Sequence, residues 1–186
     1  MSWRGSKTQS NLLELSHSRY RRLLRLAART CACGSVQAMT YQRYNHRMSE
    51  FKFFHPIEVR YGDLDPQGHV NNAKYLTYFE QARVMYFDQL GLFSADRSFM
   101  DIGVIIADIH IAYHAPVRLN MPIKVGVRAK KIGGKSIVLE QAVVAATTGK
   151  EMAKGEVVMV TYDYRDQKTI PVPDEWRNKI SRFEGR

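Results

Sequence analysis

The longest periodic pattern in the chain predicts one apolar helix. Asn71 and Asn72 are residue types that commonly cap the start of a helix, and Gly91 is a typical stop signal. Between them, apolar residues recur at gaps of four, three, four and four, which is helical spacing; they are Tyr75, Phe79, Ala82, Tyr86 and Leu90. Other apolar residues widen this stripe, so we expect the helix to be surrounded on most of its sides.

Strand-like patterns lie on both sides of this helix. Residues 52–61 precede it and end near the turn residues Pro66-Gln67-Gly68. After a loop near residues 94–103, four further runs have the alternation or the bounding turns of strands, and they cover residues 108–114, 123–129, 136–146 and 152–164. A strand, a buried helix and then an antiparallel meander predict an α+β fold, in which a curled antiparallel β-sheet wraps a long central helix. Residues 171–186 are expected to form a tail with a short exposed helix.

Composition and charge narrow the classes of protein. With 45% hydrophobic and 11% aromatic residues, the chain suits a soluble protein with a core. No stretch approaches the roughly 18 to 20 uninterrupted apolar residues that a membrane span needs. The net charge is +10, but residues 1–48 hold nine Lys/Arg against one acid, while the rest carries 19 basic and 17 acidic side chains. The folded part is therefore near neutral, and a nucleic-acid-binding face is not predicted.

Residues 1–48 are set apart from the predicted fold. They are rich in Arg and Ser and contain several Leu residues, which is typical of an amphipathic transit peptide. Met48 is also a plausible natural start, so the segment is otherwise interpreted as artefactual or as a disordered tail. A basic arm that contacts RNA or a membrane is a third interpretation. In each case we expect one folded domain over residues 49–170.

The two cysteines, Cys31 and Cys33, both lie in this N-terminal segment. A Cys-x-Cys pair is too closely spaced for an easy disulfide and lacks the further ligands of a zinc module, so we interpret it as incidental. A domain without cysteine is compatible with a reducing compartment. We expect a cytoplasmic protein, or a mitochondrial or plastid one if residues 1–48 are a transit peptide.

Residues 65–72, which read DPQGHVNN, contain the chemistry of a possible active site. A helix that begins after a tight turn offers unpaired backbone N–H groups and the positive end of its dipole, and such an end binds an oxyanion. If the Asp65 carboxylate lies across the turn, a carbonyl carbon fits between the acid and these donors, as hydrolysis by acyl transfer requires. Asp65 then attacks directly to form an anhydride, or acts as a general base on water. The sequence leaves both routes open.

The stretch Val59–Tyr75 resembles the signature of hotdog-fold thioesterases of the 4-hydroxybenzoyl-CoA thioesterase-like family. Residues 79–83, FEQAR, are similar to what that family carries along its central helix, and the resemblance extends from about residue 51 to 164. It implies that Asp65 is the catalytic carboxylate and that the backbone N–H of Asn72 polarises the thioester carbonyl.

The resemblance also implies a substrate and an assembly. It points to hydrolysis of acyl-CoA without a cofactor, by a homodimer with its sheets joined edge to edge, or by a homotetramer, with active sites between subunits. The same stretch is similar to plant acyl-ACP thioesterases through Asp65, Gln67 and His69. Because Gln67 replaces the Asn of that arrangement, we favour acyl-CoA over acyl-ACP.

Further residues are assigned to substrate binding. Gln67, Gly68 and Tyr75 belong to the motif, and His69 either hydrogen-bonds substrate or water or braces the turn. Cations near the Gly133-Gly134 turn are candidates for holding the nucleotide phosphates, or they form an ordinary solvated hairpin; this set is Lys130, Lys131 and Lys135, with Ser136 beside them.

Several other polar residues are interpreted as structural. Asp63 is expected to be a turn or capping acid, and Glu80 and Arg83 are expected to form an ion pair three residues apart on the helix. His110 and His114 share a strand face, but no third ligand is evident and no metal site is predicted.

Two rival functions keep the same fold. Hotdog hydratases use an Asp and a His five residues apart, whereas Asp65 and His69 are four apart. A non-catalytic module that binds acyl-CoA is the second rival, and the intact Asp65 argues against it. The sequence does not identify the acyl group.

Overall fold

The computed structural model describes residues 50–93 and 102–186 of the chain. The N-terminal segment with Cys31 and Cys33, and most of the loop expected at residues 94–103, lie outside these residues. Residues Ser49–Arg186 form one compact unit. Its elements are β1 (Phe53–Ile57), the 3-10 turn η1 (Tyr61–Asp63), α3 (Lys74–Gln89), β2 (Gly103–Tyr113), β3 (Ile123–Ile132), β4 (Ser136–Ala145), β5 (Glu151–Asp163), β6 (Lys168–Thr169) and α4 (Asp174–Glu184).

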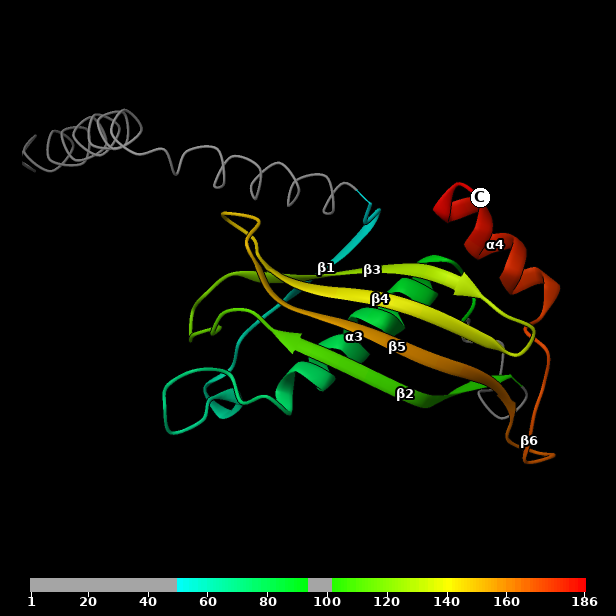
Figure 1. Ribbon diagram of the computed structural model, residues 1–186, viewed down its shortest axis with the longest axis horizontal. Coiled ribbons are helices and arrows are strands. Elements are labelled where there is room, and N and C mark those ends of the chain that lie inside the picture. The colour runs from blue at the N-terminus through cyan, green and yellow to red at the C-terminus, as the bar shows by residue number, and fades with distance from the viewer. Residues whose placement is uncertain (1–49, 94–101) are drawn as a thin grey trace, which may run out of the picture. The chain divides into compact units, whose positions relative to one another are not determined.

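The strands form one antiparallel sheet that curls around α3 (Figure 1). The order is β1-β3-β4-β5-β2, with the short β6 paired to β5. Strand β1 is shorter than the predicted strand at residues 52–61, because its partner β3 begins at Ile123, opposite Ile57. The α+β class and the curled antiparallel sheet around a helix are confirmed.

Helix α3 packs on the sheet through its large aromatic residues. Phe79, Tyr86 and Phe87 have no exposed surface. Gly155 on β5 lets the helix approach closely, because a Cβ there would lie 2.4 Å from the Phe79 ring. The opposite side of the helix is not covered within one chain: the side chains of Leu76, Val84 and Met85 are exposed.

The C-terminal helix α4 is part of the packed domain. Trp176 and Ile180 are buried, so the expectation of an exposed helix in a C-terminal tail is wrong. Trp176 packs against the ring of Phe87 on α3, with centroids 6.1 Å apart. Glu184 accepts hydrogen bonds from the Tyr86 hydroxyl at 2.7 Å and from the Ala129 N–H at 2.8 Å. Trp176 and Ile180 lie four residues apart, so they share one face of α4, and burial of this apolar face stabilises the packed position of the helix.

Across residues 50–93 and 102–186, no helix is long and apolar enough to cross a membrane.

Candidate active site

A tight turn holds the carboxylate of Asp65. The Asp65 N–H donates to the His69 carbonyl at 2.8 Å, and the Gly68 N–H donates to the Asp65 carbonyl at 3.0 Å. Gly68 has a φ of 77°, which glycine adopts without strain. Asp65 Oδ1 accepts the N–H groups of Gln67 at 3.0 Å and His69 at 3.3 Å, while Oδ2 lies 3.4 Å from His69 Nδ1. Oδ1 is therefore engaged by the backbone, and Oδ2 is the oxygen available for chemistry.

The start of α3 presents an unpaired backbone donor beside this carboxylate. Asn71 shapes the turn that leads into the helix, because its Oδ1 accepts the Ala73 N–H at 2.9 Å and its carbonyl accepts the Lys74 N–H at 2.9 Å. Within the described part of the chain, no acceptor is bonded to the Asn72 N–H. The Asn72 carbonyl accepts the Tyr113 hydroxyl at 3.1 Å, which fixes the peptide on its other side. An unpaired N–H at a helix start is suited to stabilising an oxyanion.

The acid and the donor open into one pocket of about 380 Å³. Of the residues predicted for the site, Asp65, His69, Asn72 and Tyr75 line it, together with Val70, Tyr113, His114, Ala115 and Pro116. Gln67 and Gly68, which the sequence assigned to substrate binding, are not among the lining residues. Gln67 contributes its backbone N–H to the Asp65 carboxylate and Gly68 shapes the turn, so their contacts in the structure support the acid itself.

Asp63 braces the same turn from inside the protein, as expected. It is buried, and its carboxylate accepts the Arg60 N–H at 3.0 Å and the Tyr78 hydroxyl at 2.9 Å. Its carbonyl accepts the Asn71 N–H at 2.8 Å, which joins the turn to the start of α3. Burial alone would raise the pKa of Asp63, but these donors and the charge of Arg60 hold the pKa below its ordinary value. Burial and the Asp63 hydrogen bond raise the pKa of Tyr78 in turn.

Two polar side chains that line the pocket, those of Tyr113 and His114, were not predicted for the site. Tyr113 packs edge-on against Tyr75 with ring centroids 5.1 Å apart, and His114 Nδ1 lies 3.5 Å from Glu151 Oε1. The sequence drew attention to His114 only as a partner of His110 for a metal. In the residues that the structure describes, no group of three His, Cys, Asp or Glu side chains could hold a metal ion. No signal in the chain itself relates the end of β2 to the start of α3, 41 residues away.

The predicted phosphate-binding cations lie at the other end of the helix. Lys130 pairs with Glu156, and Lys135 Nζ donates to the carbonyl and hydroxyl oxygens of Thr169, each at 3.2 Å. Lys131 is exposed and Ser136 begins β4. Their hairpin is tied to α4 by the Arg177 side chain, which donates to Gly133 at 2.9 Å. Since α4 packs on Phe87 near the end of α3, one subunit does not bring these residues to Asp65 (Figure 1).

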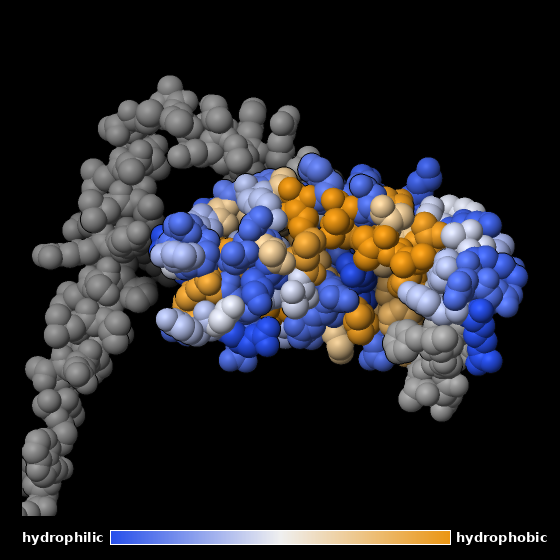
Figure 2. All heavy atoms as spheres, turned by 90° about the horizontal axis from the view of Figure 1, so that it is seen from below, coloured by the Kyte–Doolittle hydropathy of each residue, from blue (hydrophilic) through white to orange (hydrophobic). Residues whose placement is uncertain are grey.

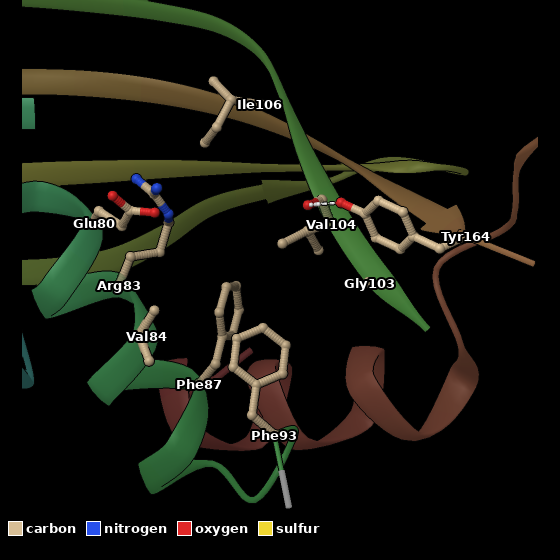
Figure 3. A pocket seen from close by; sticks show the side chains of 9 residues that line it. All are labelled: Glu80, Arg83, Val84, Phe87, Phe93, Gly103, Val104, Ile106 and Tyr164. Carbon is tan, nitrogen blue, oxygen red and sulfur yellow. Dashed lines mark hydrogen bonds between the residues drawn. The ribbon is translucent and has the colours of Figure 1, made fainter. Parts of the chain in front are cut away.

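The expected ion pair between Glu80 and Arg83 is not formed. Arg83 turns inward, where it is 8% exposed and its Nη1 donates to Gln141 Oε1 at 3.4 Å, while Glu80 stays exposed. The buried amide of Gln141 offers Arg83 an acceptor on the sheet side of the helix. Glu80 and Arg83 both line a second pocket of about 360 Å³ between α3 and β2 (Figure 3).

Comparisons with known proteins show which family the chain belongs to. The chain matches the thioesterase-like superfamily over residues 59–180. It is 31% identical to the long-chain acyl-CoA thioesterase FadM of Escherichia coli strain K12 over 132 residues, which cover 68% of this chain and 96% of that protein. It is 29% identical to the chloroplastic acyl-acyl carrier protein thioesterase ATL2 of Arabidopsis thaliana over 135 residues, 70% of each protein.

A solved structure supports the same relationship. A thioesterase of Thermus thermophilus, complexed with coenzyme A and Zn, is 35% identical and has a TM-score of 0.65, covering 75% of this chain and 98% of its own. The superfamily match spans well over half of the chain and includes the turn, α3 and the whole β2–β5 meander. The chain therefore belongs to the thioesterase-like superfamily and has its hotdog fold.

Proposed function

We propose that this protein is a thioesterase that hydrolyses acyl-CoA to a free acid and CoA. The observation that carries the proposal is that Asp65 and the unpaired N–H of Asn72 line one pocket. A carboxylate and an oxyanion donor facing one cavity are what hydrolysis by acyl transfer requires. FadM, named as an acyl-CoA thioesterase, and the relative complexed with coenzyme A support the choice of substrate.

The geometry supports a two-step reaction. As a general base, Asp65 Oδ2 takes a proton from water, and the oxygen of that water attacks the thioester carbonyl carbon. The oxyanion that forms is stabilised by the Asn72 N–H, and its collapse breaks the C–S bond and releases CoA as the thiolate. In the alternative route Oδ2 attacks the carbonyl directly, and water then hydrolyses the anhydride. Tyr113 serves both routes, because its hydroxyl holds the Asn72 peptide in place.

The test is release of free thiol from short-chain, long-chain and aromatic acyl-CoAs by the full chain and its variants. We expect Asp65→Asn and Asp65→Ala to lower kcat by about 10²- to 10⁴-fold while the fold is retained. Asp166→Asn, at an exposed acid in the turn before β6, is the matched control and should keep full activity. Thiol release that is indifferent to Asp65 would contradict the proposal. Crotonyl-CoA in the same panel, assayed for added water, tests the hydratase alternative.

Acyl-ACP hydrolysis is the second candidate, favoured by the similarity to ATL2. Running each acyl group on both carriers separates the two. A catalytic efficiency higher on acyl-ACP than on the matched acyl-CoA would reverse our preference.

A cytoplasmic location is part of the proposal. Cell fractionation with an antibody to the domain tests this location, together with the role of residues 1–48.

The proposed working unit is a homodimer joined at β2. This strand has 11 residues and forms the edge of the sheet, where it pairs with β5. An exposed edge of this length is a template for pairing with another strand. Figure 2 shows apolar residues gathered on the side of the molecule where β2 lies, and the exposed apolar side chains of β2 and α3 include Ile105, Ile106, Leu76 and Val84. Pairing of two such dimers into a tetramer is the larger assembly that the motif implies.

A two-fold axis at β2 has a consequence for the site. Antiparallel pairing of β2 with its copy places the Gly103 end of one strand near the Tyr113 end of the other. The pocket at Asp65 lies at the Tyr113 end, and the pocket at Arg83 lies at the Gly103 end. The two pockets of different subunits therefore approach each other across the proposed interface. The same operation brings the Lys130–Ser136 hairpin of one subunit toward the acid of the other, as phosphate binding requires.

A further inference from the structure

Two polar side chains interrupt the apolar interface between α3 and the sheet. Gln141 is fully buried on the inner face of β4, between Leu139 and Val143, and Arg83 is 8% exposed on the facing side of α3. Burying a polar or charged group costs free energy unless it is fully hydrogen-bonded. An amide and a guanidinium at core positions therefore indicate a function other than stabilising the core.

Gln141 holds the guanidinium of Arg83 in a fixed position. Its Nε2 donates to the Phe79 carbonyl at 2.8 Å, which leaves its Oε1 to accept Arg83 Nη1 at 3.4 Å. Arginine has five N–H donors, and this long bond uses one of them. No carboxylate of residues 50–93 or 102–186 forms an ion pair with Arg83, although the negative charge of Glu80 partly offsets the lowering of its pKa by burial. Donors of Arg83 therefore remain for a ligand.

The second pocket gives such a ligand a mixed surface. It is lined by Glu80, Arg83, Val84, Phe87, Phe93, Gly103, Val104, Ile106 and Tyr164. Figure 3 shows the polar heads of Glu80 and Arg83 next to each other on one side, with the rings of Phe87 and Phe93 on another. The Tyr164 hydroxyl donates to the Val104 carbonyl at 3.2 Å and is already used. The cavity thus suits a mainly apolar ligand that carries one polar group.

We propose that this second pocket receives the acyl chain of the substrate beyond the thioester, and that it selects chains carrying a hydroxyl group through Arg83 and Glu80. This inference rests on the proposed thioesterase function. A hydroxyl accepts a hydrogen bond from Arg83 and donates one to Glu80, so it matches both heads. A plain alkyl chain displaces water from Arg83 without replacing its hydrogen bonds. A carboxylate pairs with Arg83 but is repelled by Glu80.

The test compares kcat/KM of the full chain on decanoyl-CoA, on its 3-, 6- and 10-hydroxy derivatives and on the ω-carboxy derivative. We expect at least one hydroxy derivative to exceed decanoyl-CoA by about 10-fold or more, because a site built to hydrogen-bond a hydroxyl discriminates against the analogue that lacks it. The position of the preferred hydroxyl measures how far the second pocket lies from the thioester. In Arg83→Met the ratio of kcat/KM on the preferred hydroxy derivative to kcat/KM on decanoyl-CoA should fall to about one. Arg182→Met, at an exposed arginine of α4, should leave it unchanged.

A second variant keeps the inference testable if Arg83→Met fails to fold. Glu80 is exposed, so Glu80→Gln should preserve the fold, and it should improve the ω-carboxy substrate relative to the hydroxy substrates. Equal kcat/KM for all decanoyl derivatives, or a preference that survives Arg83→Met, would overturn the inference and leave the thioesterase proposal intact.

If the wild type hydrolyses no acyl-CoA, the proposed function fails, and calorimetric binding of free 10-hydroxydecanoic acid against decanoic acid still tests the pocket. Tighter binding of the hydroxy acid that is lost in Arg83→Met would support the pocket by itself. Equal binding of the two acids would overturn it.

Discussion

Asp63 and Asp65 carry the same carboxyl group two residues apart, but their surroundings give them different roles. Asp63 points into the protein, where Tyr78 and the Arg60 N–H bind its oxygens. Asp65 keeps one oxygen in a pocket that reaches the start of α3. The resemblance to the hotdog thioesterases predicted which of the two acids would be structural, and the local turn geometry explains why the two side chains point in different directions.

The paired contacts of Asp63 predict its effect on stability. Asp63→Asn should lower the free energy of unfolding by about 1–3 kcal/mol, the usual range for a buried hydrogen bond to a charged group. Because the pKa of Asp63 in the folded protein lies below its ordinary value of 3.8, the wild type gains this stability above that value and loses it as the pH falls through the lowered pKa. Urea unfolding from about pH 3 to about pH 7 should show a flatter acid limb in the variant. Asp88→Asn, at an exposed acid of α3, is the control. An acid limb of equal slope in the wild type and in Asp63→Asn would contradict this account of Asp63.

Tyr113 illustrates what the sequence could not supply at the scale of single residues. Its hydroxyl contacts the Asn72 carbonyl across 41 residues of chain, a tertiary register that strand periodicity does not encode. Tyr113→Phe keeps the ring against Tyr75 and removes the hydrogen bond. We expect kcat to fall by about 3- to 10-fold, the equivalent of one hydrogen bond of ordinary strength, with a smaller effect on KM. Tyr61→Phe, at a tyrosine that is 82% exposed, is the control and should have no effect. If Tyr113→Phe raises KM by a larger factor than it lowers kcat, Tyr113 acts in substrate binding instead.

At the scale of elements, periodicity predicted the central helix and the four strands of the meander, and the structure confirms them. Helical and strand spacing are local properties, so the chain reveals them directly. The packing of α4 was missed, because Trp176 contacts Phe87 and Phe183 contacts Tyr86, and both partners lie on a distant element. The need for glycine at position 155 likewise could not be predicted from the sequence, because it arises from the close packing of α3 on β5.

The close approach at Gly155 gives the prediction at this scale. A methyl group there would lie 2.4 Å from the Phe79 ring and 3.1 Å from the His110 carbonyl, both within the packed sheet and helix. Gly155→Ala should therefore destabilise the protein by about 1–3 kcal/mol through overpacking. Gly134→Ala is the matched control, because nothing lies within 4 Å of a Cβ at that position. Thermal unfolding of both variants checks the difference, and equal melting temperatures would contradict close packing of α3 on β5.

For the whole molecule, the parts of the proposed active site lie apart in a single chain. Asp65 and the Asn72 N–H lie at one end of α3, while the Arg83 pocket and the lysine hairpin lie toward the other. Three apolar residues of α3 are exposed, although the sequence pattern predicted a helix surrounded on most sides. A second subunit at β2 would account for both features. The sequence pattern therefore fits the proposed dimer, and a single folded chain satisfies it only in part.

Disruption of the β2 edge tests this assembly. Ile105 is 40% exposed on β2 and does not line either pocket. Ile105→Lys places a charge at the proposed interface, where an unpaired buried cation is costly, so the dimer should dissociate into monomers. Light scattering after size-exclusion chromatography measures the mass, and thiol release should be lost together with the dimer because the proposed site draws on both subunits. Leu119→Lys, at an equally exposed leucine beyond β2, should remain dimeric and active. A monomeric wild type with full activity would show that one chain holds a complete site, and the acyl group would then have to reach the Arg83 pocket along α3 within the same subunit.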